Sequence, residues 1–389
     1  LIALAVAFLQ TRGISFNEKI SIIAKGVGDD NIITMCLIFL VAGAFSGSVS
    51  AAGGVNSTVN LGLSLLPPGI AVIGLFIIGC FISISMGTSM GTIAALAPIA
   101  MGISEKTDFP IAICIGAVVS GAMFGDNLSM ISDTTIAAVR TQGCDMRDKF
   151  RKNFLIVLPA AIATIVILFF MTSGAHFTVS KNLDYNIFQV IPYILVLVTA
   201  LIGLNVFIVL IGGIAFSVIA GLATGAMKVS QIFTSMGKGA TGMYDITVIS
   251  ILVACISALV KYNGGFAFIL ENIHKHIHSY KGAEFGVAAL VGLIDCATAN
   301  NTVAIVIAGP IAKEISDDYG IEPARTASLL DMFASVFQGI IPYGAQLLSA
   351  ASLTGLSSFD IMPYLFYPYL MAVCGIVSII ISKKKLGKA

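Results

Sequence analysis

The chain has 389 residues, of which 57% are apolar and 11% are charged, and its mean hydropathy is +0.99. Soluble domains carry roughly 25% charged residues, so this composition excludes a soluble globular protein and predicts a polytopic membrane protein. The net charge of +1 and the lack of a basic tract give no reason to expect a nucleic-acid partner. The partner that this composition requires is the lipid bilayer.

The apolar runs have about the length that a helix needs to cross the membrane, roughly 20 residues, and they lack β-barrel alternation. An incomplete helix at 1–9 is followed by a polar loop at 10–30 and a span at 31–53. A stretch at 68–103 is interrupted by SISMGTSMGT, and a span at 109–140 is interrupted by GDNLSMISDTT. The remaining predicted spans are 153–173, two helices in 189–224, 244–262, an interrupted stretch at 284–315, an interrupted span at 323–355, and 361–382.

The two halves of the chain resemble each other. A shift of about 212 residues places GTIAALAPIAMGISEKTDFP over VAIVIAGPIAKEISDDYGIE, with Pro98 on Pro310. Because an odd number of crossings separates equivalent points, the copies have opposite orientations, an arrangement typical of secondary transporters. We therefore predict an all-α fold with inverted-topology repeats at 1–173 and 189–382. Each repeat has one re-entrant hairpin (68–103 or 284–315) and one broken transmembrane helix (109–140 or 323–355).

Basic residues orient the predicted spans. The loop at 140–152 carries five of them, Lys149 included, and is expected to be cytoplasmic. With this topology the same face collects 17 of the 21 Lys and Arg residues, which predicts a multi-pass protein of the inner (plasma) membrane with a cytoplasmic C-terminus. Arg325 is expected to lie at a helix end with its charged group extended toward water, and no Lys or Arg is predicted inside the membrane. Glu284 lies near the end of a predicted span and is expected to be solvated.

Four aspartates lie inside predicted spans: Asp126, Asp133, Asp295 and Asp331. A charged carboxylate there costs about 2.5–3.5 kcal/mol on insertion scales and therefore indicates a polar pathway or a cation site. Asp331 differs from the others because it lies in the regular apolar stretch ASLLDMFASVF. As an isolated carboxyl group in a low-dielectric setting, it is a candidate proton carrier.

The four interruptions are rich in hydroxyl and amide side chains, and they expose backbone groups that lipid cannot satisfy. Such oxygen ligands suit a hard monovalent cation, whereas an anionic substrate would call for positive charge. The predicted Na+ site is Asp126 and Asp133 with neighbouring hydroxyls, and Asp133→Asn is expected to lose transport yet still fold. The candidate cation- or substrate-binding residues are Asp126, Asn127, Ser129, Ser132, Asp133, Thr134, Thr88, Ser89, Asp295, Asn300, Asn301, Thr302, Asp331 and Gln338.

The segment GAMFGDNLSMISDTTIAA (121–138) resembles the GD-x-x-S-x-x-SDTT motif of the NhaC-type Na+/H+ antiporters, and LLDMFASVFQGIIPYGAQLL (329–348) is similar to that family's second-half segment. The family resembles the wider ion transporter superfamily, in which hairpin tips with Ser-Asn-Thr bind sodium and substrate. The matching tips here are Gly87-Thr88-Ser89 and Asn300-Asn301-Thr302, which depart from that triplet. The resemblance implies an elevator-like mechanism and a homodimer.

The sequence therefore predicts a secondary active transporter in which Na+ and H+ are the transported or coupling ions and no cofactor is needed. Sodium-coupled transport of a small amino acid or hydroxy acid remains an alternative, because the interruptions also carry amides that suit a zwitterion, such as Asn300 and Gln338. An ion channel is disfavoured by the inverted repeat. An enzyme is not expected, since no nucleophile–base pair, phosphate loop or dinucleotide turn is apparent.

Overall fold

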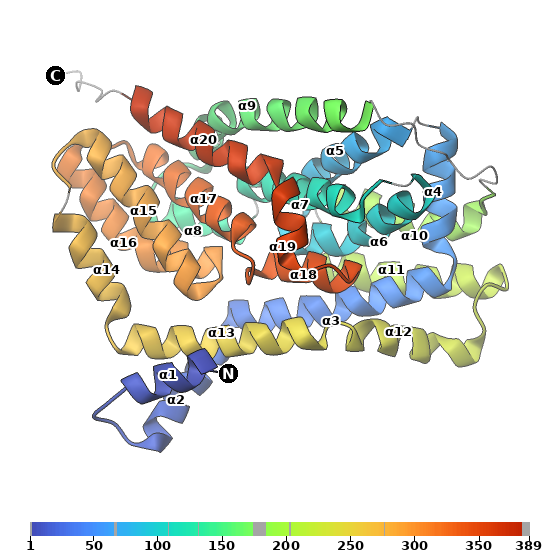
Figure 1. The fold of residues 1–389 in the computed structure, drawn as a ribbon, viewed down its shortest axis with the longest axis horizontal. Coiled ribbons are helices and arrows are strands. Elements are labelled where there is room, and N and C mark those ends of the chain that lie inside the picture. Colours follow the sequence, from blue (N-terminus) through green and yellow to red (C-terminus); the bar gives the residue numbers. More distant parts are fainter. Residues whose placement is uncertain are drawn as a thin grey trace.

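The computed structural model describes residues 2–65, 68–107, 109–130, 132–173, 184–201, 204–275 and 277–382. Regular structure within these residues is entirely helical, which confirms the predicted all-α class (Figure 1). Three helical stretches among them are long and apolar enough to cross a membrane: Ile32–Ala51, Ile111–Gln142 and Met146–Thr172.

The first half of the chain forms helices on both sides of two interruptions. Its elements are α1 (Ile2–Gln10), α2 (Phe16–Val27), α3 (Asp30–Ala51), α4 (Gly54–Leu65), α5 (Pro68–Met86), α6 (Ser89–Thr107), α7 (Ile111–Leu128), α8 (Asp133–Gln142) and α9 (Met146–Ser173). The helices α5 and α6 form the first hairpin, and α7 with α8 forms the first broken helix, at the positions that the polar interruptions predict.

The second half repeats this order of hairpin and broken helix. Its elements are α10 (Ile187–Leu201), α11 (Val206–Ala223), η1 (Val229–Gln231), α12 (Ile232–Thr241), α13 (Tyr244–Tyr262), α14 (Gly265–Lys275), α15 (Tyr280–Thr298), α16 (Asn301–Tyr319), α17 (Pro323–Ile340), α18 (Ala345–Thr354), α19 (Ser358–Ile361), η2 (Met362–Tyr364) and α20 (Phe366–Ile381). Here α15 and α16 form the hairpin, and α17 with α18 forms the broken helix.

The backbone at each interruption explains why the helix stops. Gly87, at the first hairpin tip, has a φ of +68°, which glycine adopts without steric cost. The second tip turns at Ala299, whose φ of +51° is unusual for a residue with a Cβ atom. In the first broken helix, Ser129 and Ser132 are extended, and in the second, Ile341 and Gly344 are extended. At all four interruptions, the amides and carbonyls at the helix ends have no hydrogen-bond partner within their own helix.

The two halves pack reciprocally. Each hairpin lies on the first part of its own broken helix, α5 and α6 on α7, and α15 and α16 on α17. The second part of each broken helix then packs on the hairpin of the other half, α8 on α16 and α18 on α6. Figure 1 shows the hairpin of α15 and α16 on the left and α5 and α6 on the right, with the broken helices between them. This arrangement brings both hairpin tips and both interruptions to the centre of the molecule.

Close approach of α5 and α7 depends on two glycines. A Cβ atom on Gly121 would lie 2.3 Å from the carbonyl oxygen of Phe76, and one on Gly125 would lie 2.4 Å from the Cβ atom of Ser83. Such small-residue contacts are the usual means of packing helices in membranes, where lipid offers no hydrophobic driving force between helices. They fix the end of α7, and with it Asp126, against the first hairpin.

Two sequence predictions are wrong at the level of helix boundaries. The stretch 10–30 is not a loop throughout, because it contains α2, whose first turn is closed by a capping box between Ser15 and Glu18. The span predicted at 153–173 begins earlier, at Met146, so Lys149 lies inside α9 and not in a loop. The two helices predicted within 189–224 correspond to α10 and α11, and the connection between them falls partly outside the described residues.

Candidate functional site

Both hairpin tips and both broken helices face one central cavity of about 160 Å³. That volume holds several water molecules, since a water in the liquid occupies about 30 Å³, and it far exceeds what one bare ion requires. Backbone breaks are tolerated at this depth where they line such a cavity. The lining residues are Asp30, Thr34, Ile38, Gly87, Thr88, Ser89, Met90, Asp126, Ser132, Asp133, Thr134, Asn300, Asn301, Thr302, Gln338, Ala345 and Gln346.

Asp126 is the buried acidic group of this cavity. Its carboxylate accepts one hydrogen bond on each oxygen, from Ser89 Oγ to Oδ2 at 2.7 Å and from Ser132 Oγ to Oδ1 at 2.6 Å. The Ser132 hydroxyl also lies 2.9 Å from that of Thr134. Only 6% of Asp126 is exposed, and no ion pair among the described residues involves it. Its negative charge therefore lacks a fixed counterion, which a mobile cation or a proton must supply.

A chain of amides joins the second hairpin tip to this carboxylate. Gln338 Nε2 donates to the carbonyl oxygen of Ala299 at 3.2 Å and to Gln346 Oε1 at 2.7 Å. Gln346 Nε2 in turn donates to Ser89 Oγ at 3.1 Å, and Ser89 donates to Asp126. Movement of the first hairpin tip would therefore change the hydrogen bond from Ser89 to Asp126. Movement of the second tip would act on the same bond through Gln338 and Gln346.

Ten of the fourteen predicted site residues line the cavity, and four do not. Asn127, Ser129, Asp295 and Asp331 lie elsewhere, although all four are buried. Ser129 donates to the carbonyl oxygen of Ile84 at 2.7 Å and thus joins α5 to the break. Gln346 also lines the cavity; the sequence places it among the amides of the interruptions but not among the fourteen predicted site residues.

Asp133 differs from Asp126 in its surroundings. It is the first residue of α8, and its side chain is exposed at the cavity, whereas that of Asp126 is buried. A carboxylate in contact with water keeps its charge at little cost, so it gains less from a bound ion than a buried one does. The two aspartates thus differ in burial, although the sequence-based prediction treated them as equivalent ligands.

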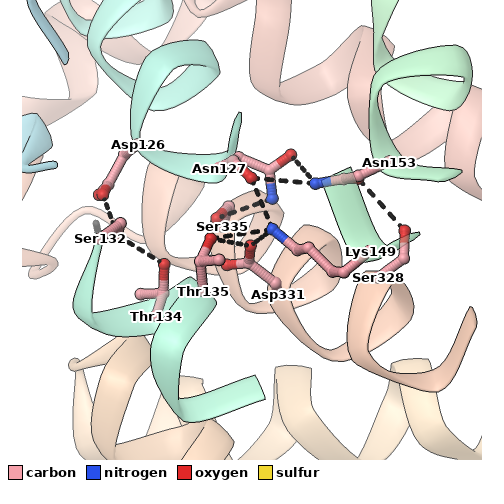
Figure 2. Close-up of polar contacts among 10 residues, drawn as sticks. All are labelled: Asp126, Asn127, Ser132, Thr134, Thr135, Lys149, Asn153, Ser328, Asp331 and Ser335. Carbon is pink, nitrogen blue, oxygen red and sulfur yellow. Dashed lines mark hydrogen bonds and ion pairs between the residues drawn. The ribbon is translucent and has the colours of Figure 1, made fainter. Parts of the chain in front are cut away.

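The prediction that Asp331 is an isolated carboxyl group is wrong (Figure 2). Lys149 of α9 forms an ion pair with Asp331 Oδ2, and the two side chains are 1% and 0% exposed. The same ammonium donates to the carbonyl oxygen of Asn127 at 2.8 Å and to Thr135 Oγ1 at 2.9 Å. A paired carboxylate is a poor free proton carrier, because its charge is already compensated. The expectation that no Lys or Arg lies in the interior is also wrong.

Further polar side chains hold Asn127 next to this ion pair. Asn153 Nδ2 donates to the Asn127 carbonyl oxygen at 3.0 Å and to its side-chain oxygen at 2.8 Å. Asn127 Nδ2 lies 3.5 Å from Ser335 Oγ, and Ser328 Oγ donates to Asn153 Oδ1 at 3.3 Å. Figure 2 shows this network on one side of the α7 break and Asp126 with Ser132 on the other. Asp126 and Asn127, near the end of α7, therefore belong to two different polar clusters.

Asp295 also differs from Asp126 in its surroundings. It lies on α15 one turn before the second hairpin tip, is fully buried, and has no hydrogen-bond partner for either carboxylate oxygen among the described residues. It does not line the central cavity. The structure therefore separates Asp295 from the cluster that the sequence placed it in.

A larger cavity of about 410 Å³ adjoins the central one at the second hairpin tip. It lies between α2, α13 and α16, and the side chains of Lys25, Asp29 and Lys261 are among its lining residues. Asn300 lines both cavities. The two cavities therefore share Asn300 as a lining residue.

The hydroxyl contacts of Asp126 can be tested with two serines from the same break. If the sequence-based prediction of a Na+ site at Asp126 holds, Ser132→Ala is expected to raise the Na+ concentration at half-maximal transport about tenfold, because a hydrogen bond to a charged group contributes about 1.5–3 kcal/mol. Ser129→Ala is the matched control, since Ser129 is equally buried but donates to a backbone carbonyl outside the cavity. Transport assays over a range of Na+ concentrations compare them, and equal shifts in both variants would contradict the assignment.

Comparison with known proteins agrees with this architecture. A family model described as the Na+/H+ antiporter family matches residues 1–173 and 182–382. Among curated proteins, the malate-2H(+)/Na(+)-lactate antiporter of Bacillus subtilis (strain 168) is 23% identical over 92% of this chain and 82% of its own length. The Na(+)/H(+) antiporter NhaC of the same organism is 23% identical over 96% and 90%. The arginine/ornithine antiporter ArcD of Halobacterium salinarum is 24% identical over 83% and 74%.

These relatives align along most of their own lengths, so the likeness extends well beyond the short motifs of the α7 and α17 breaks. All three names denote antiporters, although the solutes in those names differ. Because the family model covers nearly the whole chain, the protein belongs to the Na+/H+ antiporter family of membrane-embedded secondary transporters.

Proposed function

We propose that this protein exchanges Na+ for H+ across the membrane and that Asp126 carries both ions in turn. The supporting observation is a buried carboxylate that faces a cavity, accepts two hydroxyl hydrogen bonds and has no fixed positive partner within the part of the chain that the structure describes. The only buried ammonium nearby among the described residues, that of Lys149, is committed to Asp331. Among the acidic groups that line the cavity, Asp126 is thus the one at which a mobile cation has most to gain.

Exchange follows from the competition of two ions for one carboxylate. With Na+ or H+ bound, the charge of Asp126 is compensated and the cost of moving this buried group through a low-dielectric region is small. With neither bound, it carries an uncompensated charge whose burial is expensive, so the empty form does not cross readily. The carrier then changes sides only when loaded, and each Na+ that Asp126 carries in one direction is replaced by one proton in the other.

Sodium needs several oxygen ligands, and the cavity supplies them from four elements. Ser89 and Ser132 already contact Asp126, and their hydroxyl oxygens can turn their lone pairs to an ion once their protons point elsewhere. Hard cations prefer carboxylate, carbonyl and hydroxyl oxygens. We propose that these groups bind Na+ together with the cavity-lining residues Thr88, Asp133, Thr134, Asn300, Asn301, Thr302 and Gln338.

We also propose how access alternates. The halves 1–173 and 189–382 act as inverted repeats, and their hairpins and broken helices move as one body that carries the site past the remaining helices, as in an elevator. The reciprocal packing of α8 on α16 and α18 on α6 supports a common moving body, because neither half can shift without the other. Homodimer formation and a cytoplasmic C-terminus complete this proposal.

Exchange coupled to an organic solute is the second candidate. The cavity, at about 160 Å³, is larger than an ion needs, and it is lined by the amides of Asn300, Asn301, Gln338 and Gln346. Such groups can bind the carboxylate or ammonium of a small acid or amino acid. The named solutes of two relatives, malate with lactate and arginine with ornithine, identify the compounds to test first.

Proteoliposome flux distinguishes these candidates. Vesicles loaded with a pH dye are exposed to an outward or inward Na+ gradient, and internal pH is recorded. Na+/H+ exchange predicts that an inward Na+ gradient alkalinises the lumen without any added solute, whereas choline at equal ionic strength does not. If internal pH changes only when malate, lactate, arginine or ornithine is also present, the organic exchange is supported and the simple cation exchange is refuted.

A further inference from the structure

The ammonium group of Lys149 is enclosed by oxygen atoms from three separate helices. It contacts the carbonyl oxygen of Asn127 at the end of α7, Thr135 Oγ1 on α8 and Asp331 Oδ2 on α17 (Figure 2). These three oxygens are called the cage below. Lys149 is 1% exposed and Asp331 is not exposed at all, so bulk water does not compensate either charge.

The cage has the chemistry of a cation site. It combines one backbone carbonyl, one hydroxyl and one carboxylate, the oxygen types that hard metal ions select. The Asn127 carbonyl is one of the last four of α7, which lack an intrahelical partner and lie at the negative end of the helix dipole. Asp126, the preceding residue, belongs to the central cavity, so one helix end supplies two neighbouring cation sites.

We propose that the cage is a second cation site in which the ammonium of Lys149 takes the place of a metal ion. The lysine is covalently tethered, so this site is always occupied and its occupant never leaves. Asp331 then needs no ion from solution, and Asp126 is left as the buried carboxylate of this break that requires one. Lys149 therefore limits the number of sodium ions that bind at the α7 break.

The cage is also suited to hold an ion once the lysine is shortened. Asp331 Oδ1 is buried and has no hydrogen-bond partner among the described residues, which leaves a fourth oxygen beside the three that Lys149 contacts. The Asn127 carbonyl stays in place without Lys149, because Asn153 Nδ2 also donates to it. Removing the side chain beyond Cβ leaves the three cage oxygens around a vacated position, which an ion can enter together with water. Lys149→Ala should thus convert the cage into a site for free Na+.

The test measures sodium binding as protein stability and does not require transport. Asp126→Asn serves as the background because it removes the cavity site, and Lys149→Ala is added to it. Purified double variant is heated in increasing NaCl, with choline chloride keeping ionic strength constant. A ligand that binds only the folded state raises the melting temperature with its concentration. We expect the melting temperature to rise with NaCl in the double variant and to stay constant in Asp126→Asn alone.

Two controls separate the cage from general charge effects. Lys152→Ala in the same background removes a lysine of α9 whose ion pair with Glu322 is partly exposed, and it should show no dependence on Na+. Adding Asp331→Asn to the double variant removes the cage carboxylate and should abolish the rise. The proposal is overturned if Lys149→Ala gives no Na+-dependent rise, or if the variant fails to fold at every Na+ concentration, because an ion able to fill the cage would rescue it. Because exchange is not measured, these results stand apart from those of the flux experiment.

Discussion

Replacement of Asp126 by Asn is expected to reduce Na+-driven proton movement in proteoliposomes at least 100-fold while leaving the protein folded. The amide keeps the shape of the carboxylate, so the contacts with Ser89 and Ser132 can be replaced by hydrogen bonds of similar geometry. It carries no charge, however, and therefore neither attracts Na+ nor takes up a proton. The variant should elute from size-exclusion chromatography like the wild type and show background rates at all Na+ concentrations.

Asp133→Asn is the matched comparison, because Asp133 lines the same cavity but is exposed. We expect this variant to retain exchange with weaker Na+ affinity, which revises the sequence-based prediction of complete loss. In the wild type, lowering the pH should raise the Na+ concentration needed for half-maximal rate, since both ions compete for Asp126. The assignment fails if Asp126→Asn keeps saturable exchange or if Asp133→Asn alone abolishes it.

Arg325→Ala is expected to cause a large loss of stability, although Arg325 does not line the central cavity. Arg325 of α17 contacts Glu284 of α15 through two donors, at 2.8 and 3.3 Å, and Ser382 donates to the same carboxylate at 2.6 Å. Glu284 is fully buried and Arg325 is 11% exposed. Removing one partner of a buried pair costs about 3–5 kcal/mol, because the remaining charge is left uncompensated. A thermal melt in detergent should show a markedly lower midpoint.

A double-mutant cycle identifies the cause of that loss. Glu284→Gln with Arg325→Ala removes both charges and should recover most of the stability, since two neutral groups leave no buried charge. Lys313→Ala is a suitable control, because its ion pair with Asp317 is exposed and such pairs contribute about 0–1 kcal/mol. If the double variant is as unstable as Arg325→Ala alone, the damage comes from lost packing of the arginine and not from an unpaired charge.

The sequence predicts the helix interruptions because the causes are local. Polar residues and glycine within an apolar run are visible in any window of a dozen residues, and Gly87 turns the first hairpin tip where that pattern predicts. The same holds for Asp126 and Ser132, which lie six residues apart and form a direct hydrogen bond. This part of the site needs no long-range information.

The pairing of distant charges could not be predicted in the same way. Lys149 and Asp331 are 182 residues apart, and Arg325 and Glu284 are 41 apart, so nothing in either neighbourhood identifies the partner. Lys149 also lies among five basic residues, which favoured a loop. One signal was available: Lys149, Asn153, Val157 and Ala160 recur at helical spacing, and all four are buried on one face of α9.

Asn300 lines both the 410 Å³ and the 160 Å³ cavity, and this has a kinetic consequence. Its side-chain oxygen accepts a hydrogen bond from the Val303 amide at 3.0 Å, so turning the side chain breaks one hydrogen bond and leaves the helices in place. Side-chain rotation is far faster than the displacement of whole helices. A smaller residue at position 300 is therefore expected to change leak between the two cavities more than the maximal velocity of transport.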